Sequence, residues 1–182
     1  MTEKSLPTSR PYPANTSARP EILRSYGRLM TTHLYATHLD WSGSTGDGYR
    51  SYRRDHHAAG AQGNAPGVEL SAAPEFRGDA TRLNPEQLLV MAASSCQLLS
   101  FLAVAAQAGV DVITYTDDAD GIMPSDPQPA RLTQITLSPV IQVAPGTDHG
   151  LVRALMEQAH DQCYIAHSLT ADITISPTVV DA

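Results

Sequence analysis

The spacing of apolar side chains changes along the second half of the chain, and each change predicts a different element of secondary structure. Apolar and polar residues alternate over residues 110–117, 131–143 and 169–175, and this period of two is typical of strands. Pro139 lies inside the middle run. Because proline has no N–H to donate to a strand ladder, it indicates an edge or a bulge there.

The longest apolar run has helical spacing and clear ends. It begins at Asn84, a favourable N-cap, with Pro85 at the first helical position. Gln87 completes a capping-box spacing, and Gly109 is the natural stop. Between these ends every face is apolar or small, so the helix must be buried on all sides. In one domain of this size, that requirement predicts a sheet on one side and a partner on the other.

A second helix is predicted after Asp148, which can cap its first turn. Leu151, Leu155 and Ala159 recur at four-residue steps, and Cys163 continues the same stripe. This stripe predicts that one face of the helix packs against the core.

The first half of the chain predicts a tail followed by strands. Residues 1–30 are rich in Pro, Ser, Thr and Arg without a sustained period, so we expect a tail or a loose surface wrap before a single domain over residues 31–182. Strands are predicted over residues 33–41, 48–57 and 68–71.

Residues 58–67, 72–83 and 118–130 are predicted to be loops, since they are rich in Gly, Pro or charged residues. The predicted order is three strands, a helix, two strands, a helix and a strand. This order indicates an α+β domain in which helices cover one face of a mixed sheet.

Composition narrows the possible partners. The 182-residue chain has a formal net charge of −7 and scattered basic residues, which argues against binding to nucleic acid or to an anionic membrane surface. Residues 88–106 approach the length of a membrane span, but their serines, glutamine and cysteine favour a core helix. Residues 1–30 lack the apolar stretch of a secretory signal, so we expect a cytoplasmic protein.

The chain has two cysteines, and each lies on a predicted helix. Cys96 is in the middle of the apolar run, and Cys163 is near the end of the second helical run. A thiol that a peroxide oxidises, together with a second thiol that forms a disulfide with it, is the arrangement of a thiol peroxidase. A free cysteine in an apolar helix is also a common core residue, so a purely structural role stays open at this point.

The residues around both cysteines resemble a known family. Asn84-Pro-Glu-Gln-Leu-Leu89 followed by Cys96 is similar to the OsmC/Ohr family of peroxide reductases, and residues 163–169 resemble its second-cysteine region. Further similar segments are residues 53–56, 75–79, 108–110 and 115–123. The resemblance spans about residues 33–176. It implies the OsmC-like fold, with mixed or antiparallel sheets and two central helices, in an intertwined homodimer.

The resemblance also implies a reaction. Organic hydroperoxides would be reduced by Cys96, which becomes a sulfenic acid, and Cys163 would resolve it as a disulfide. An external thiol would then reduce the disulfide; a lipoyl protein, thioredoxin and a small dithiol remain alternatives. No cofactor is implied.

In this family an arginine stabilises the thiolate and a glutamate orients that arginine. Glu86 matches the glutamate directly. The arginine has no clear counterpart, and we expect it to be Arg54, with Arg53 and Arg50 as alternatives. A guanidinium suits this role, since it stays charged when buried and can bind a thiolate and a carboxylate together.

One geometric constraint does not depend on the family. Glu86 and Cys96 are separated by about 15 Å of rise and about 80° of rotation on a straight helix. The carboxylate therefore cannot touch the thiol of its own helix. If both serve one site, Glu86 must come from the other subunit or act through an intervening residue.

The sequence allows two other interpretations. His160, Cys163 and His167 have helical spacing that could present metal ligands, and His56-His57 is a second candidate, but neither offers a fourth ligand, so we expect no metal. The alternative function is a binding module or redox sensor with the same fold, whose pocket holds a small apolar ligand. The discriminating feature is whether an arginine reaches Cys96.

Overall fold

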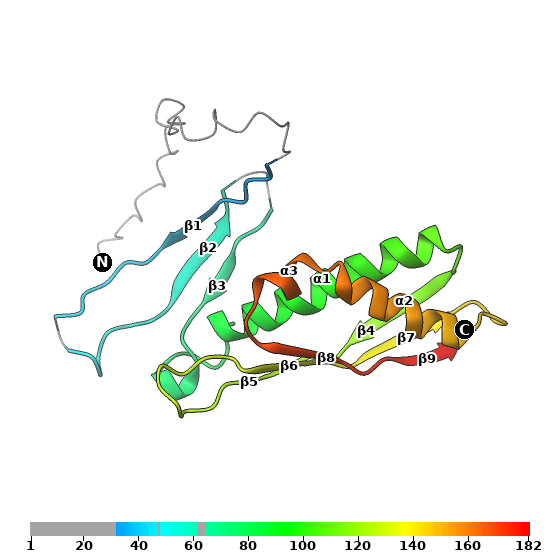
Figure 1. Ribbon diagram of the computed structural model, residues 1–182. Helices are drawn as coiled ribbons and strands as arrows, with labels where there is room; N and C mark the ends of the chain where they lie inside the picture. Colours follow the sequence, from blue (N-terminus) through cyan, green and yellow to red (C-terminus); the bar gives the residue numbers. More distant parts are fainter. Residues whose placement is uncertain (1–31, 47, 62–64) are drawn as a thin grey trace, which may run out of the picture. The chain divides into compact units, whose positions relative to one another are not determined.

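The computed structural model describes residues 32–46, 48–61 and 65–182 (Figure 1). Contacts divide the chain after Tyr35, and the fold described below is that of residues 36–182. The predicted tail over residues 1–30 lies outside the described residues.

The first sheet is a small antiparallel one. It has the order β1-β2-β3, with β1 at Thr37–Asp40, β2 at His56–Gly60 and β3 at Val68–Leu70. The first and third strands confirm the predictions. The predicted strand over residues 48–57 is wrong over most of its length, because residues 48–55 form a turn and irregular backbone, and β2 extends into residues 58–60, which were predicted to be a loop.

Arg54 explains this shift. Its guanidinium donates hydrogen bonds to the carbonyl oxygens of Tyr49, at 2.8 Å, and Tyr52, at 2.9 Å. The segment is therefore curled around the arginine rather than extended. β2 follows as His56-His57-Ala58-Ala59-Gly60 and pairs with β1 on one side and β3 on the other.

The long helix α1 extends over Pro85–Gln107 and has the predicted ends. The Asn84 side chain accepts from the Gln87 amide at 2.8 Å, and the Gln87 side chain accepts from the Asn84 amide at 3.1 Å, so the capping box is present. Gly109 has a φ of 72°, in the left-handed region that ends helices.

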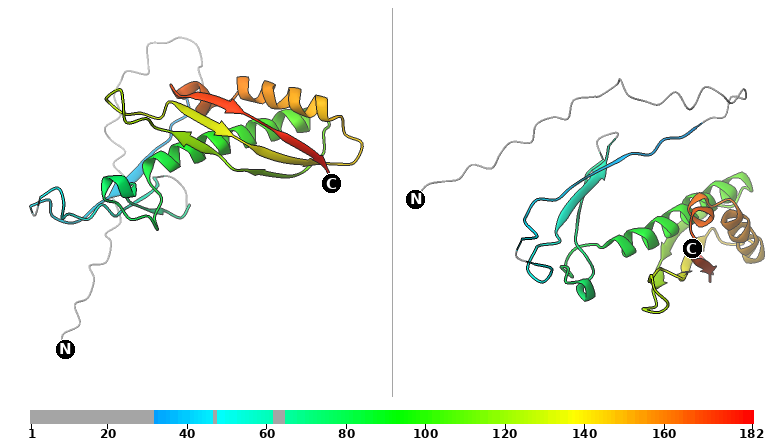
Figure 2. Two further views of the ribbon diagram at one scale, coloured as in Figure 1. Left: turned by 90° about the horizontal axis from the view of Figure 1, so that it is seen from below. Right: turned by 60° about the vertical axis from the view of Figure 1, so that its left-hand side comes forward.

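The other six strands form two three-stranded sheets that lie end to end (Figure 2), and we call the pair the second sheet. One half has the order β4-β7-β9 and the other has the order β5-β6-β8. The bounds are Val112–Asp117 for β4, Asp120–Ile122 for β5, Gln134–Leu137 for β6, Pro139–Val143 for β7, Asp172–Ile175 for β8 and Thr178–Asp181 for β9. The pairs β6–β8 and β7–β9 are parallel and the others antiparallel, so the sheet is mixed, as predicted.

Four short elements were missed by the sequence patterns. They are β5, β9, the helix α3 at Tyr164–Ser168 and the 3-10 helix η2 at Pro74–Phe76. The predicted strand over residues 131–143 is two strands that break at Ser138, directly before Pro139. Elements this short contain too few residues for a period to be recognised.

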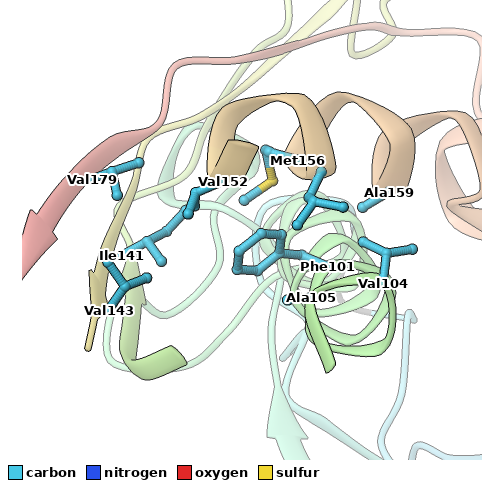
Figure 3. Close-up of a cluster of buried hydrophobic side chains, with 10 residues drawn as sticks. Phe101, Val104, Ala105, Ile141, Val143, Val152, Met156, Ala159 and Val179 are labelled. Atoms are coloured by element: carbon cyan, nitrogen blue, oxygen red, sulfur yellow. The ribbon is translucent and has the colours of Figure 1, made fainter. Parts of the chain in front are cut away.

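The helices cover one face of this sheet. The second long helix, α2, extends over His149–Asp161, and Asp148 caps it by accepting from the Gly150 amide at 2.8 Å. The larger apolar cluster lies between α1, α2 and the sheet (Figure 3). Its buried members are Phe101, Val104, Ala105, Ile141, Val143, Val152, Leu155, Met156, Ala159 and Val179. A smaller cluster is formed by Ala93, Ile135 and Leu137.

A polar layer, which we define as Ser94, Gln97, Asp117 and Ser138, includes residues of α1 and of the break in the sheet. The Ser94 hydroxyl on α1 donates to Asp117 Oδ2 at 2.5 Å, and the Ser138 amide donates to Asp117 Oδ1 at 2.7 Å. Both oxygens of one carboxylate are therefore used, one by the helix and one by the break in the sheet. The layer fixes the level at which α1 crosses the sheet.

Much of α1 is left uncovered within one protomer. Of its 23 residues five are buried, and the exposed apolar side chains include Leu89, Met91, Leu99 and Leu102. The all-round burial expected from the sequence is therefore not reached in a single protomer. By length and composition α1 could cross a membrane, and it is the one such helix within the described residues. Burial against a partner chain would account for the same apolar surface.

Replacing Asp117 with alanine is expected to lower the free energy of unfolding by about 2–3 kcal/mol, because it removes hydrogen bonds to a charged acceptor and leaves two donors unpaired. Asp118→Ala removes the same charge from an exposed neighbour and is the control, with an expected change below about 0.5 kcal/mol. Urea unfolding measures both. Equal losses in the two variants would contradict the role given to Asp117.

Candidate active site

The two cysteines meet in the folded protomer. Cys96 lies in the middle of α1 and is partly exposed, whereas Cys163 follows α2 as the N-cap residue of α3 and is 1% exposed. The Cys96 thiol is near enough to Cys163 to raise the pKa of that buried thiol, and both are free cysteines. The fold thus brings together the two positions that the sequence singled out, and no large rearrangement is needed to join them.

The two thiols have different surroundings. Burial raises the pKa of the Cys163 thiol above its ordinary value, because its thiolate would lose hydration. The backbone amide of Ala166 in α3 lowers the pKa of Cys163 by hydrogen bonding to its sulfur, and the neighbouring Cys96 raises that pKa further. At neutral pH Cys163 is therefore a protonated thiol, and Cys96 is the thiol that a reactant from solvent can reach.

Gln97, next to Cys96 on α1, belongs to the polar layer and is fully buried. Its Nε2 donates to the backbone oxygen of Met156 at 3.2 Å and to the Met156 sulfur at 3.1 Å. Its Oε1 is buried and has no hydrogen-bond partner. The dithiol thus lies beside a polar contact between α1 and α2.

Arg54 is not at the thiols within one protomer. Besides its two hydrogen bonds to carbonyl oxygens, its guanidinium stacks on the rings of Tyr52, at 4.1 Å, and Tyr49, at 4.9 Å. Such cation–π contacts keep a guanidinium charged while they remove it from bulk water. The interaction holds Arg54 as a preformed cation on the first sheet.

The other arginines near this sheet are engaged elsewhere. Arg53 is 80% exposed and pairs with Asp55 at 2.7 Å. Arg82 pairs with Glu69 at 2.5 Å, and Arg50 is exposed. Across the described ranges of the protomer, none of these guanidinium groups hydrogen-bonds to a cysteine.

Glu86 shares a cavity with Arg54. The cavity has a volume of about 570 Å³ and lies between the first sheet and the start of α1. Aromatic side chains line much of it, and they are Trp41, Tyr49, Tyr52 and Phe76. Glu86 Oε2 is buried and has no hydrogen-bond partner within the protomer, so a donor from outside could bind there.

The candidate residues therefore form two groups in one protomer. Cys96 and Cys163 form one, and Arg54 and Glu86 lie on the wall of the aromatic cavity. Glu86 and Cys96 are ten residues apart on α1, so the geometry of the helix keeps the carboxylate away from the thiol of the same chain. One chain by itself does not bring the cation to the thiols.

The histidine cluster does not form a metal site among the described residues. His167 Nε2 is 2.8 Å from the backbone oxygen of Asp161, which engages that ring at the end of α2. No three His, Cys, Asp or Glu side chains in the described ranges are grouped to hold a metal ion.

Sequence reasoning missed two residues of this region. Gln97 and Asp117 were not selected; Gln97 is a polar residue inside an apolar helix, and Asp117 begins the acidic run over residues 117–120. Gln97 follows Ser94 by three residues, so both lie on one side of α1. That repeated polar position in an apolar helix is the signal that could have indicated the layer.

Comparison with known proteins places the chain in a family. The family model described as OsmC-like protein matches residues 78–178, and the chain belongs to this family. Comparison with curated proteins gives no match.

Solved structures share the fold. An OsmC-like protein of unknown function from Vibrio cholerae is 23% identical with a TM-score of 0.72, covering 80% of this chain and 99% of that one. An organic hydroperoxide resistance protein from Elizabethkingia anophelis is 19% identical with a TM-score of 0.61, covering 84% and 99%. Another from Legionella pneumophila is 19% identical with a TM-score of 0.60, covering 81% and 98%. The chain has the OsmC-like α+β fold, which hydroperoxide resistance proteins also have.

The unequal surroundings of the thiols predict unequal alkylation. At pH 7.5 iodoacetamide should modify Cys96 at least about 10-fold faster than Cys163, because only a thiolate reacts and Cys163 is both buried and protonated. The difference should narrow as the pH rises toward the raised pKa of Cys163. Mass spectrometry of the labelled peptides gives both rates.

In protein unfolded by urea the two cysteines should react with iodoacetamide at similar rates. This control shows that the difference in the folded protein comes from the fold and not from the neighbouring sequence. Faster labelling of Cys163 than of Cys96 in the folded protein would contradict the assignment of the accessible thiol.

Proposed function

We propose that the protein is a thiol-dependent peroxidase that reduces organic hydroperoxides to alcohols. The observation that carries the proposal is the contact between an accessible thiol, Cys96, and a buried one, Cys163. The shared fold with organic hydroperoxide resistance proteins supports it. An aqueous, cytoplasmic location is part of the same proposal.

The first step uses Cys96. Its thiolate attacks the distal oxygen of the hydroperoxide, the O–O bond breaks, and the alkoxide takes up a proton and leaves as an alcohol. Cys96 becomes a sulfenic acid, so sulfur has been oxidised by two electrons and the peroxide reduced by two.

The second step uses Cys163. Its sulfur attacks the sulfenic sulfur of Cys96, an S–S bond forms, and the hydroxyl leaves as water with the proton of the Cys163 thiol. An external dithiol then returns two electrons and two protons by thiol–disulfide exchange. The contact between the two thiols supports this step, because resolution then requires little movement.

We further propose that the working form is an intertwined homodimer. The exposed apolar side chains of α1 support a partner, because apolar groups gathered on one helix of a protein surface are typical of an interaction site. The buried but unpaired Oε2 of Glu86 and the preformed Arg54 cation support a site completed across subunits. In such a dimer, Arg54 and Glu86 of one subunit would face the thiols of the other.

The engagement of Arg54 with tyrosines favours a second candidate. If Arg54 stays on Tyr49 and Tyr52, the aromatic cavity is a binding site for a small apolar ligand and the thiols oxidise slowly. This is the binding or redox-sensing module, and the two candidates differ in peroxide turnover.

Turnover of cumene hydroperoxide separates the candidates. With excess dithiothreitol the wild-type protein should consume the peroxide, and Cys96→Ser should lose at least about 10³-fold because it lacks the nucleophile. Cys163→Ser should retain one fast turnover and then slow down, since it has no resolving thiol. Peroxide consumption and alcohol release are followed by chromatography.

Wild-type consumption equal to that of Cys96→Ser would reject the peroxidase and leave the binding module. Normal cycling by Cys163→Ser would reject the two-cysteine mechanism alone.

Mixed dimers test the division of the site between subunits. Arg54→Gln should lower kcat/KM by about 10²-fold, because the thiolate loses its cation. Coexpression of Arg54→Gln with Cys96→Ser should restore about a quarter of wild-type activity, since half the dimers would be mixed and each would hold one complete site. Arg53→Gln is the matched control and should behave as wild type.

No recovery in the mixed dimers would indicate that cation and thiol come from the same chain. Undiminished activity in Arg54→Gln would remove Arg54 from the site.

A further inference from the structure

Gln97 is an unusual residue to find where it lies. It is fully buried, next to Cys96, in a helix whose other buried residues are all apolar (Ala93, Phe101, Val104 and Ala105). Its carboxamide oxygen has no hydrogen-bond partner. A buried acceptor without a donor is destabilising, and a leucine of similar shape would avoid that cost. Stability therefore does not explain why a glutamine is here.

What the glutamine does provide is a directional contact. Its Nε2 donates to the Met156 backbone oxygen at 3.2 Å and to the Met156 sulfur at 3.1 Å. Among the described residues these two are the side-chain hydrogen bonds that join α1 to α2, and Gln97 donates both. The rest of that contact is apolar packing, and Figure 3 shows Met156 entering the cluster beside Phe101.

Apolar packing tolerates small slips, but a disulfide does not. Sliding α2 by one residue along α1 moves it by about 1.5 Å. An S–S bond is about 2.05 Å long and restricts the Cα–Cα distance to about 4.4–6.8 Å. Met156 lies two turns before Cys163 on the same stretch of chain. A contact that fixes Met156 therefore also fixes where Cys163 meets α1.

We propose that Gln97 is a positioning residue for disulfide formation: its carboxamide holds α2 in register with α1 so that Cys163 reaches Cys96. This inference rests on the proposed function, and it assigns a role in the resolving step rather than in the attack on peroxide. Gln97 acts through Met156 and not on the reacting sulfurs.

The test measures the Cys96–Cys163 disulfide at equilibrium with reduced and oxidised glutathione, which needs no peroxidase activity. Gln97→Leu should lower the effective concentration of the two thiols at least about 10-fold, since fewer conformations place the sulfurs together. Its melting temperature in the reduced state should equal or exceed that of the wild type, because the unpaired acceptor is gone. A merely structural residue would give the opposite pattern, with lower stability and an unchanged disulfide.

Two further variants calibrate the result. Met156→Leu removes the sulfur acceptor but keeps the backbone oxygen, so its effective concentration should stay within about threefold of the wild type. Ser100→Ala, three residues further along α1 than Gln97, is the matched control and should leave the disulfide equilibrium unchanged. If Gln97→Leu does not fold, Gln97→Met gives the same comparison with a linear side chain.

An unchanged disulfide equilibrium in Gln97→Leu overturns the proposal, and so does a wild-type protein that forms no Cys96–Cys163 disulfide with glutathione. The wild type can form the disulfide with glutathione, and Gln97→Leu can weaken it, while neither protein turns over peroxide. That outcome supports the positioning role of Gln97 and rejects only the peroxidase.

Discussion

Asp117 accepts one hydrogen bond from Ser94 on α1 and another from the Ser138 amide at the break in the sheet. Because this one carboxylate binds both the helix and the break in the sheet, it fixes the position along the strands at which α1 crosses the sheet. Gln97 holds the same helix against α2 through its hydrogen bond to the Met156 backbone oxygen. The two cysteines lie beside this polar layer, so their mutual distance depends on hydrogen bonds as well as on apolar packing.

A polar layer in a protein core costs stability unless each group has a partner. Gln97 Oε1 in this layer lacks one, and so does the buried Tyr115 Oη, whose residue lies near Asp117. Burial raises the pKa of the Tyr115 hydroxyl, and the nearby Asp117 charge adds to the effect, so this group stays neutral. Such groups persist in natural proteins where position matters more than stability. In the proposed reaction, the position that matters is that of the two sulfurs.

The long helix and the cysteines were predictable from the sequence because their signals are local. The capping box at Asn84 and the stop at Gly109 are matched by the structure, and the two cysteine segments resemble the family to which the chain belongs. The course of residues 48–60 was not predictable, because the Arg54 side chain determines it by binding carbonyl oxygens of the preceding turn. Periodicity does not report such a contact. Similarly, β9 exists because β7 pairs with it, and no pattern within four residues reveals that pairing.

The central claim is that Cys96 and Cys163 of one chain form the redox centre. The most direct measurement is a single turnover, in which reduced protein reacts with one equivalent of cumene hydroperoxide and is then digested without reduction. The account predicts the loss of two thiols per chain and a peptide that links Cys96 to Cys163 of the same chain. Retention of both thiols, or a link between chains only, would contradict it.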